Sequence, residues 1–520
     1  MDIRCRREKK NENLSSRFQS NLFLSSPYAT SPTIPALEGG YNDEVGRDGD
    51  RLSSLPENII RHIFLFLGSI DIVRASSVSK QWRYFWVSMP YLNFESNGYD
   101  FGSRSEIKFN YFVNWVLMSR NRLVDMQRFR ISHLHLKENS AFYRLMDVIT
   151  GFNLHEIDLT IESKDEIELP QCILNCGSLV SLKLYFRNCV LKQQTFPGFS
   201  KLKSLELCFV MFIDSLSLAN FVSSCPVLEN LSVEGCMFVD DNIIDITSTG
   251  LKDLSFILPK LSTFFKYPIR REQAREYGLK VACPNRLSLK VINLRSLEFS
   301  FQEMNSLQNL FMDLDHHYGP YGQLKIEGCH ALSKMLQGVY NLKALKVSEA
   351  FLEYLHQAVD TGCFSPSFNN LKSLTLGIKS AHFNKHSLIN MLDCSPNLEA
   401  LKFFLQLSNS PIMSKAALKM LNIPDDPWKM PNMPNGTTSC LKYNLKIIEL
   451  FQVRDDKYEL DLVRFFLKNG PVLQKMGISW VYGHGNTDEI ISEVLKFPRS
   501  SPNVALTFIE PLDISFYGKS

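Results

Sequence analysis

The chain has 520 residues, of which 45% are hydrophobic and 21% charged, and its formal net charge is +3. This composition is ordinary for a globular protein, and a charge so close to neutral gives no electrostatic reason to expect nucleic acid or a membrane as a partner. No run of about 18 apolar residues occurs, so no membrane-spanning helix is expected. The twelve cysteines mostly stand beside apolar runs, and we expect buried free thiols rather than disulfides, as at Cys208, Cys225, Cys236 and Cys394.

Residues 1–49 are polar and rich in Ser, Pro, Gly and Asn, so they are predicted to be disordered. They contain a basic cluster that is either a nuclear-import signal or part of a solvated tail: Arg4, Arg6, Arg7, Lys9 and Lys10. A transit peptide is not expected, because acidic residues stand among these basic ones.

Three short helices are predicted between residues 50 and 94. Pro56 suits the first position of a helix, where its missing N–H has no intrahelical partner. One broad apolar face follows, made by Ile59, Ile60, Ile63, Phe64 and Leu67. Gly68 ends this helix, and Ser69 is predicted to cap the second one. Ser79 is predicted to cap a third helix, which carries Trp82, Phe85 and Trp86.

This stretch is more apolar than a bundle of about 45 residues can bury by itself. The surplus apolar surface has two interpretations. It is a docking face for a partner protein, or the helices are a small cap packed on the domain that follows.

The same stretch resembles an F-box. The resemblance rests on residues 52–57 (LSSLPE), on Ile63 and Leu67, and on residues 78–83 (VSKQWR). With Phe85-Trp86 and the later residues 92–94 (LNF), it is similar to the plant F-box proteins that carry leucine-rich repeats. In that family the F-box docks on a Skp-type adaptor of a cullin-RING ubiquitin ligase. The resemblance therefore implies adaptor contacts through Leu52, Leu55, Pro56, Ile59, Ile63, Leu67, Val78, Ser79, Trp82 and Trp86.

Residues 96–128 are predicted to be a linker followed by an amphipathic helix. The apolar face of that helix consists of Phe109, Phe112, Val113, Val116 and Leu117.

From residue 129 onward the pattern Leu-x-x-Leu-x-Leu recurs with substitutions. Its middle residues are Ile157, Leu182, Leu205, Leu231, Leu254, Leu297, Leu324, Leu345, Leu374, Leu401, Ile448 and Met476. Nine of the eleven steps between them measure 21 to 29 residues, the spacing of leucine-rich repeats, and two longer steps of 43 and 47 indicate an insertion or a degenerate copy. Each copy predicts one parallel strand whose leucine face is buried only by stacking on its neighbours. Helical return segments are predicted at residues 217–223 and 385–392.

Two segments interrupt the repeats. Residues 259–289 are basic, and their positive charge centres on Lys266, Arg270, Arg271 and Arg275. This segment is either a site for an anion or an acidic target, or a solvated helix on the convex side. Residues 422–435 (NIPDDPWKMPNMPN) are rich in proline and are predicted to form an exposed loop.

The C-terminal residues 440–512 are predicted to fold as strand, helix, strand, helix, strand. Residues 440–450 (CLKYNLKIIEL), the run from Leu460 to Met476 and residues 497–502 (FPRSSP) resemble the FBD domain that closes many plant F-box proteins. Such a unit is suited to capping the end of a solenoid.

No phosphate-binding glycine loop, nucleophile elbow or zinc signature is present. Cys172 and Cys176 lack a second ligand pair at zinc spacing, and the adjacent His316 and His317 would face opposite ways on a strand. We therefore expect no enzyme activity, no metal and no cofactor.

The resemblances together imply an α/β protein in five parts: a tail (1–49), an F-box (50–95), a linker with a helix (96–128), an irregular leucine-rich-repeat solenoid or horseshoe (129–439) and an FBD cap (440–512). They imply a substrate receptor that binds a Skp-type adaptor, and through it cullin and a RING protein, together with a target protein. The alternative is a repeat scaffold or small-ligand sensor that delivers nothing for ubiquitination. The expected compartment is cytoplasmic, nuclear or both.

Overall fold

The structure is a computed structural model that divides the chain into two units, residues 1–55 and 56–520. It describes residues 55–76, 82, 84–95, 105–135, 139–163, 166–187, 190–191, 198–238, 243–259, 277–294, 299–302, 304–314, 326–337, 339–362, 367–379, 385–405, 438–454, 457–481, 487–509 and 516. The predicted disordered tail and its basic cluster lie outside these residues.

Fifteen parallel strands form one sheet, in which strands pair with their neighbours in chain order. They are β1 (Tyr91–Glu95), β2 (Arg128–His135), β3 (Glu156–Glu162), β4 (Ser181–Arg187), β6 (Ser204–Cys208), β8 (Asn230–Glu234), β11 (Asp253–Ile257), β13 (Ser288–Leu294), β15 (Asn309–Leu314), β16 (Ala344–Ser348), β17 (Ser373–Ile378), β18 (Ala400–Leu405), β19 (Ile447–Val453), β20 (Lys475–Trp480) and β21 (Ala505–Ile509).

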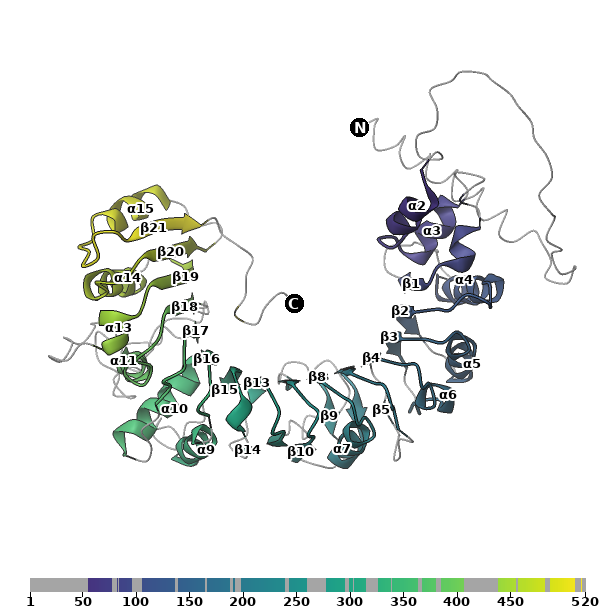
Figure 1. Cartoon of the computed structure of the whole chain (residues 1–520), viewed down its shortest axis with the longest axis horizontal. Coiled ribbons are helices and arrows are strands. Elements are labelled where there is room, and N and C mark those ends of the chain that lie inside the picture. The colour runs from purple at the N-terminus through teal and green to yellow at the C-terminus, as the bar shows by residue number, and fades with distance from the viewer. Residues whose placement is uncertain are drawn as a thin grey trace, which may run out of the picture. The chain divides into compact units, whose positions relative to one another are not determined.

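Most of the helices lie on the outer side of this curved sheet, whereas α2 (Glu57–Phe64) and α3 (Ser69–Ala75) lie at its N-terminal end, next to β1 (Figure 1). The other helices are α4 (Ser105–Ser119), α5 (Asn139–Thr150), α6 (Gln171–Leu174), α7 (Ser215–Ser223), α9 (Ile326–Leu336), α10 (Glu349–Asp360), α11 (Lys385–Asp393), α13 (Ser439–Tyr443), α14 (Lys457–Asn469) and α15 (Thr487–Leu495). Two small sheets accompany them: β5 (Val190–Leu191), β7 (Met211–Phe212) and β9 (Met237–Phe238); and β10 (Ile243–Thr247), β12 (Gly278–Ala282) and β14 (Phe299–Gln302).

The central leucines of the repeats are buried, as the periodicity predicts. Leu182, Leu205, Leu231, Leu345, Leu374 and Leu401 are each at most 2% exposed. Leu182 pairs with Leu205, Leu205 with Leu231, and Leu374 with Leu401, so one ladder of apolar side chains runs along the sheet. The helices α7 and α11 confirm the two predicted return segments. The fold is therefore the predicted α/β solenoid built on a parallel sheet.

Two of the predicted repeats are wrong in register. Leu289 of β13, not Leu297, pairs with Leu254 and Leu310 in the main sheet, whereas Phe299 belongs to a small sheet. The next copy is centred on Leu310 of β15, and Ile326, assigned to a strand with Leu324, begins α9 instead. The β13 copy escapes the pattern because Arg286 stands at its first leucine position. A nearby apolar run then matches the pattern by chance.

At the N-terminal end, α4 confirms the predicted amphipathic helix, and Phe109, Val113, Val116 and Leu117 are buried. The predicted cap at Ser69 is wrong. Gly68 precedes α3 without a side-chain cap, and the Ser69 Oγ accepts a hydrogen bond of 2.8 Å from the Asn93 N–H. Ser69 thus ties α3 to β1, the first strand of the main sheet.

At the C-terminal end the predicted order of strand, helix, strand, helix, strand is found as β19, α14, β20, α15 and β21, but the segment begins with a helix that was not predicted, because Cys440 belongs to α13. Its strands extend the same sheet, because Ile448 pairs with both Leu401 and Met476. Phe466 of α14 is fully buried, and its ring lies 5.7 Å from that of Phe403. The apolar layer behind the repeats therefore continues to β20.

The nine cysteines within the described residues are free thiols. Cys208, Cys225 and Cys236 are buried as predicted, whereas Cys394 is only half-buried. Burial raises the pKa of the Cys208 thiol to about 12 and that of Cys225 to about 11. These two thiols therefore stay protonated and act as small apolar side chains.

Candidate functional site: an apolar face on the F-box

The predicted broad apolar face of α2 is divided between the core and the surface. Ile60 is fully buried and Phe64 is 1% exposed. The ring of Phe64 packs edge-on against Trp82 at 5.7 Å and against Phe85 at 6.5 Å between ring centroids. These contacts hold α2 on the rest of the helical unit.

The other apolar residues of α2 face solvent. Ile59 is 42% exposed, Ile63 is 40% exposed and Phe66, just past the end of the helix, is 78% exposed. Their spacing of four and three residues places them on one side, and we call these three residues the α2 stripe. Glu57 and Arg61 form an ion pair of 2.6 Å on the same helix. An exposed apolar stripe beside charged residues is typical of a protein-docking surface.

The structure places the residues predicted to contact an adaptor in three groups. Ile59, Ile63 and Pro56 are exposed, and Leu55 and Leu67 are half-buried. Trp82 and Trp86 are only 7% and 9% exposed, so they form part of the core rather than a free surface. Leu52, Val78 and Ser79 lie outside the described residues. The sequence pattern did not separate the core members from the exposed ones, because both lie at helical spacing.

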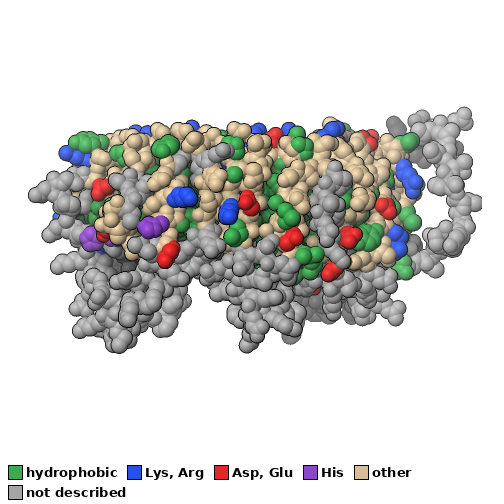
Figure 2. All heavy atoms as spheres, turned by 90° about the horizontal axis from the view of Figure 1, so that it is seen from below, with side chains coloured by type: hydrophobic (Ala, Val, Ile, Leu, Met, Phe, Trp, Pro, Cys, Tyr) green, Lys and Arg blue, Asp and Glu red, His purple; other side chains and the backbone are tan. Residues whose placement is uncertain are grey.

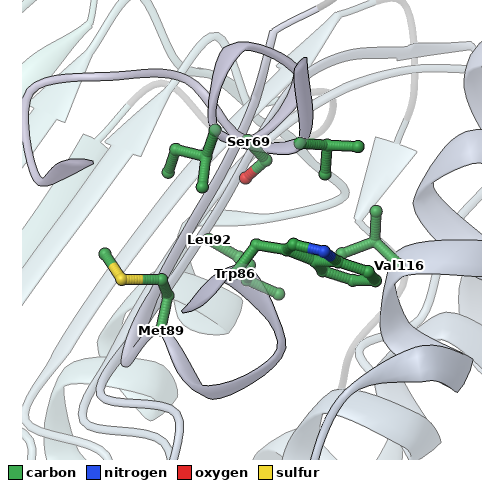
Figure 3. A pocket seen from close by; sticks show the side chains of 7 residues that line it. Ser69, Trp86, Met89, Leu92 and Val116 are labelled. Carbon is green, nitrogen blue, oxygen red and sulfur yellow. The ribbon is translucent and has the colours of Figure 1, made fainter. Parts of the chain in front are cut away.

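Trp86 joins the F-box to the repeat sheet. It lines a gap too narrow for a water molecule (Figure 3). The other lining residues are Ser69, Ile72 and Val73 of α3, Met89, Leu92 of β1 and Val116 of α4. Its ring lies 5.0 Å from that of Trp115. The helical unit therefore shares a core with the sheet.

Sequence reasoning missed the role of Arg120, which locks this junction. Its side chain is 4% exposed, and its guanidinium donates hydrogen bonds to the carbonyl oxygens of Met89 and Asp125. The second of these bonds measures 3.0 Å. Burial lowers the pKa of Arg120 to about 10, so the group remains charged at neutral pH. Its only signal in the sequence is a cation directly after an amphipathic helix.

The predicted basic site at Lys266, Arg270, Arg271 and Arg275 lies outside the described residues. On the face that Figure 2 shows, Lys and Arg side chains are interspersed with Asp and Glu. Within the part of the chain that the structure describes, no cluster of His, Cys, Asp and Glu could hold a metal ion. None of the described helices is long and apolar enough to cross a membrane.

Comparisons with known proteins agree with this architecture. Residues 52–94 match the F-box domain, and residues 120–495 match the family described as At1g61320/AtMIF1, LRR domain. The chain is 24% identical to the Arabidopsis thaliana FBD-associated F-box protein At4g13985, over 87% of this chain and 95% of that protein. It is also 24% identical to the Arabidopsis thaliana F-box/FBD/LRR-repeat protein At3g26920, over 88% of this chain and 96% of that protein. The chain therefore belongs to the plant F-box/FBD/LRR-repeat family and is an F-box protein of the substrate-adaptor type.

Proposed function

We propose that the chain is the substrate-recognition subunit of an SCF-type cullin-RING ubiquitin ligase. In this role the F-box binds a Skp-type adaptor, and through it cullin and a RING protein, while the repeats bind a target protein. The chain supplies no catalytic group. It raises the effective concentration of the target's lysines near the charged conjugating enzyme.

The observation that carries this proposal is the α2 stripe. Ile60 and Phe64 of helix α2 are buried in the core. Ile59 and Ile63 of the same helix, and Phe66 just past its end, face solvent. Burying a fully exposed side chain of this size gains roughly 1.5–3 kcal/mol, so a partner would gain most from Phe66, which is 78% exposed, and less than half of that from Ile59 or Ile63. Pro56 and the half-buried Leu55 directly precede the same helix, and the half-buried Leu67 follows its last residue, Phe64, by three residues, so the contact region extends along α2.

The test is co-purification of the full chain with a Skp-type adaptor. The variant Ile59→Ala/Ile63→Ala/Phe66→Ala should lower adaptor affinity by at least tenfold and leave the repeats folded. Leu55→Ala/Pro56→Ala should act in the same direction. Leu216→Ala is the matched control, because Leu216 is an apolar helical residue that is 61% exposed on α7, within the repeats. Unchanged adaptor capture by the triple variant would contradict the proposal and favour a repeat scaffold outside a ligase.

Residues 277–289 of the predicted basic segment form β12 and the start of β13, and Arg286 is only 1% exposed, so this part is not a free surface. The remaining basic cluster of Lys266, Arg270, Arg271 and Arg275 is proposed as a second contact for an acidic target. If it acts this way, capture of a target should weaken as salt rises, because exposed charge pairs are screened. Arg270→Glu/Arg271→Glu should then abolish capture without unfolding the chain. Equal capture by both forms would assign this segment to a solvated surface.

A further inference from the structure

Two rows of side chains lie on the inner face of the sheet, opposite the buried leucines. In the first row, Phe311 of β15 pairs with Lys346 of β16, which pairs with Thr375 of β17. In the second, Gly377 of β17 pairs with Phe404 of β18. We call Phe311, Lys346, Gly377 and Phe404 the aromatic socket.

The socket holds a residue from the far end of the chain. Phe516 is fully buried, with its ring centroid 5.1 Å from that of Phe311 and 6.0 Å from that of Phe404, both edge-to-face. The Lys346 Nζ lies 4.9 Å from the centre of the Phe516 ring and 4.4 Å from that of Phe311. Edge-to-face rings and an ammonium over ring faces are the favourable geometries of these groups.

Gly377 is the residue that makes room for the ring. A Cβ atom built on Gly377 would lie 2.8 Å from three carbon atoms of Phe516, closer than real Cβ contacts. Glycine weakens the interior of a strand and commonly marks a close approach by another group. The neighbouring positions in this row are Ser348 and Phe404, which both carry side chains. Strand β17 therefore has no side chain at the position where the Phe516 ring contacts its backbone.

Lys346 differs from Lys183 and Lys402, two other lysines on the inner face. Lys183 pairs with Glu206 at 2.7 Å and Lys402 with Glu449 at 2.8 Å. Among the described residues Lys346 has no carboxylate partner, and its contacts are the rings of Phe311, Phe404 and Phe516. Burial, followed by repulsion from Lys290, lowers the pKa of Lys346 to about 8. The socket is thus a partly dry, ring-lined site.

The chain is long enough to fill the socket from its own C-terminal end. Phe516 follows Ile509, the last residue of β21, by seven residues, which reach at most about 25 Å. Strand β17 is four strands away from β21, or about 19 Å at roughly 4.8 Å per strand. A ring tethered this closely competes at a local concentration on the order of millimolar.

We propose that the aromatic socket is a peptide-binding site that accepts one aromatic side chain from a target segment, and that Phe516 is its internal occupant. Phe516 keeps the socket filled until a segment with an aromatic residue replaces it. The statement that this segment belongs to a target protein rests on the proposed function. The binding of an aromatic side chain in the socket does not.

The test uses full-length protein and a labelled peptide with the sequence of residues 510–520 (EPLDISFYGKS), measured by fluorescence anisotropy. The Phe516→Ala chain should bind this peptide with a Kd below the millimolar range, and the wild-type chain should bind it at least tenfold more weakly because its own ring occupies the socket. The same peptide with alanine in place of its phenylalanine should bind neither chain. A peptide library panned on Phe516→Ala should be enriched in aromatic residues at one position.

A second substitution separates the socket from the rest of the face. Adding Gly377→Val to Phe516→Ala should abolish peptide binding, because the new side chain fills the place of the ring while valine suits a strand. Adding Thr160→Val, a valine on the distant strand β3, should leave binding unchanged. Three results would each overturn the proposal. The peptide binds wild type and Phe516→Ala equally, it shows no saturable binding to Phe516→Ala up to several millimolar, or it binds Phe516→Ala/Gly377→Val as well as Phe516→Ala. Adaptor capture should be the same for all these chains, so its loss in the α2 variants is a separate result.

Discussion

The two ends of the main sheet are finished in different ways. At the N-terminal end the edge strand β1 is covered, with Leu92 and Phe94 at most 3% exposed, and the exposed apolar residues lie on α2. At the C-terminal end α14 is packed into the core, but Leu506 and Phe508 of the edge strand β21 remain half-buried. One end exposes a helix surface and the other exposes a strand.

This difference shows what each end can offer to a partner. At the N-terminal end α3 lies beside β1, and the Asn93 N–H of that strand donates a hydrogen bond to the Ser69 Oγ, so the exposed apolar groups there are side chains of the α2 stripe. The C-terminal edge strand β21 pairs with β20 on one side only, so backbone N–H and C=O groups on its other side are left without a strand partner. The risk of aggregation through this edge is limited, because β21 has only five residues and Pro502 and Pro511 stand close to its two ends. The unit after Cys440 thus extends the sheet and ends it with a short strand.

The largest expected effect comes from removing the C-terminal end. Deletion of residues 440–520 should expose Leu401 and Phe403 of β18, which are fully buried in the complete chain. The uncovered apolar edge strand should make the protein insoluble or aggregated, as size-exclusion chromatography would show. A soluble, monomeric truncation with an unchanged Tm would mean that residues 440–520 form an independent module.

A single buried ring tests the same end more gently. Phe466→Ala should lower the free energy of unfolding by about 3–5 kcal/mol, because it removes a ring packed on Phe403 and leaves a cavity. Urea unfolding measures this loss. A change below about 1 kcal/mol would show that α14 is not an integral part of the core.

The pH dependence of Lys346 tests whether the inner face near the C-terminal end is covered. Its pKa is about 8 in the folded chain and is ordinarily 10.5, so between these values the unfolded chain binds more protons and stability rises with pH. Lys346→Met should be more stable than wild type at pH 7, and the gap should narrow toward pH 10. Thermal unfolding across this range measures the gap, and a gap that is constant or widens would contradict the burial of this amine.

The smallest expected effect concerns the α2 stripe. Phe66→Ala and Ile63→Ala should each change the free energy of unfolding by no more than about 0.5 kcal/mol, because both side chains already face solvent. Chemical unfolding of the free chain measures this. If either variant lowered the free energy of unfolding by several kcal/mol, the α2 stripe would be part of the core, and the two ends of the sheet would not differ as described.

Much of the fold was predictable because it repeats. Leu182, Leu205, Leu374 and Leu401 recur at repeat spacing, and burying such a periodic face requires stacked strands whatever the intervening residues are. The order of elements after Cys440 and the apolar face of α4 followed from local periodicity in the same way. The F-box motif likewise identified the segment that carries the α2 stripe.

The tertiary structure alone decided which member of an apolar pattern is buried and which distant residues meet. Periodicity does not distinguish Ile60 from Ile59, because the choice depends on where Trp82 and Phe85 pack. Periodicity favoured Leu297 over Leu289, because Arg286 stands at the first leucine position of the repeat that contains Leu289. The meeting of Phe516 with Gly377 and Lys346 has no local signal, since it depends on the number of strands that separate β21 from β17 across the folded sheet.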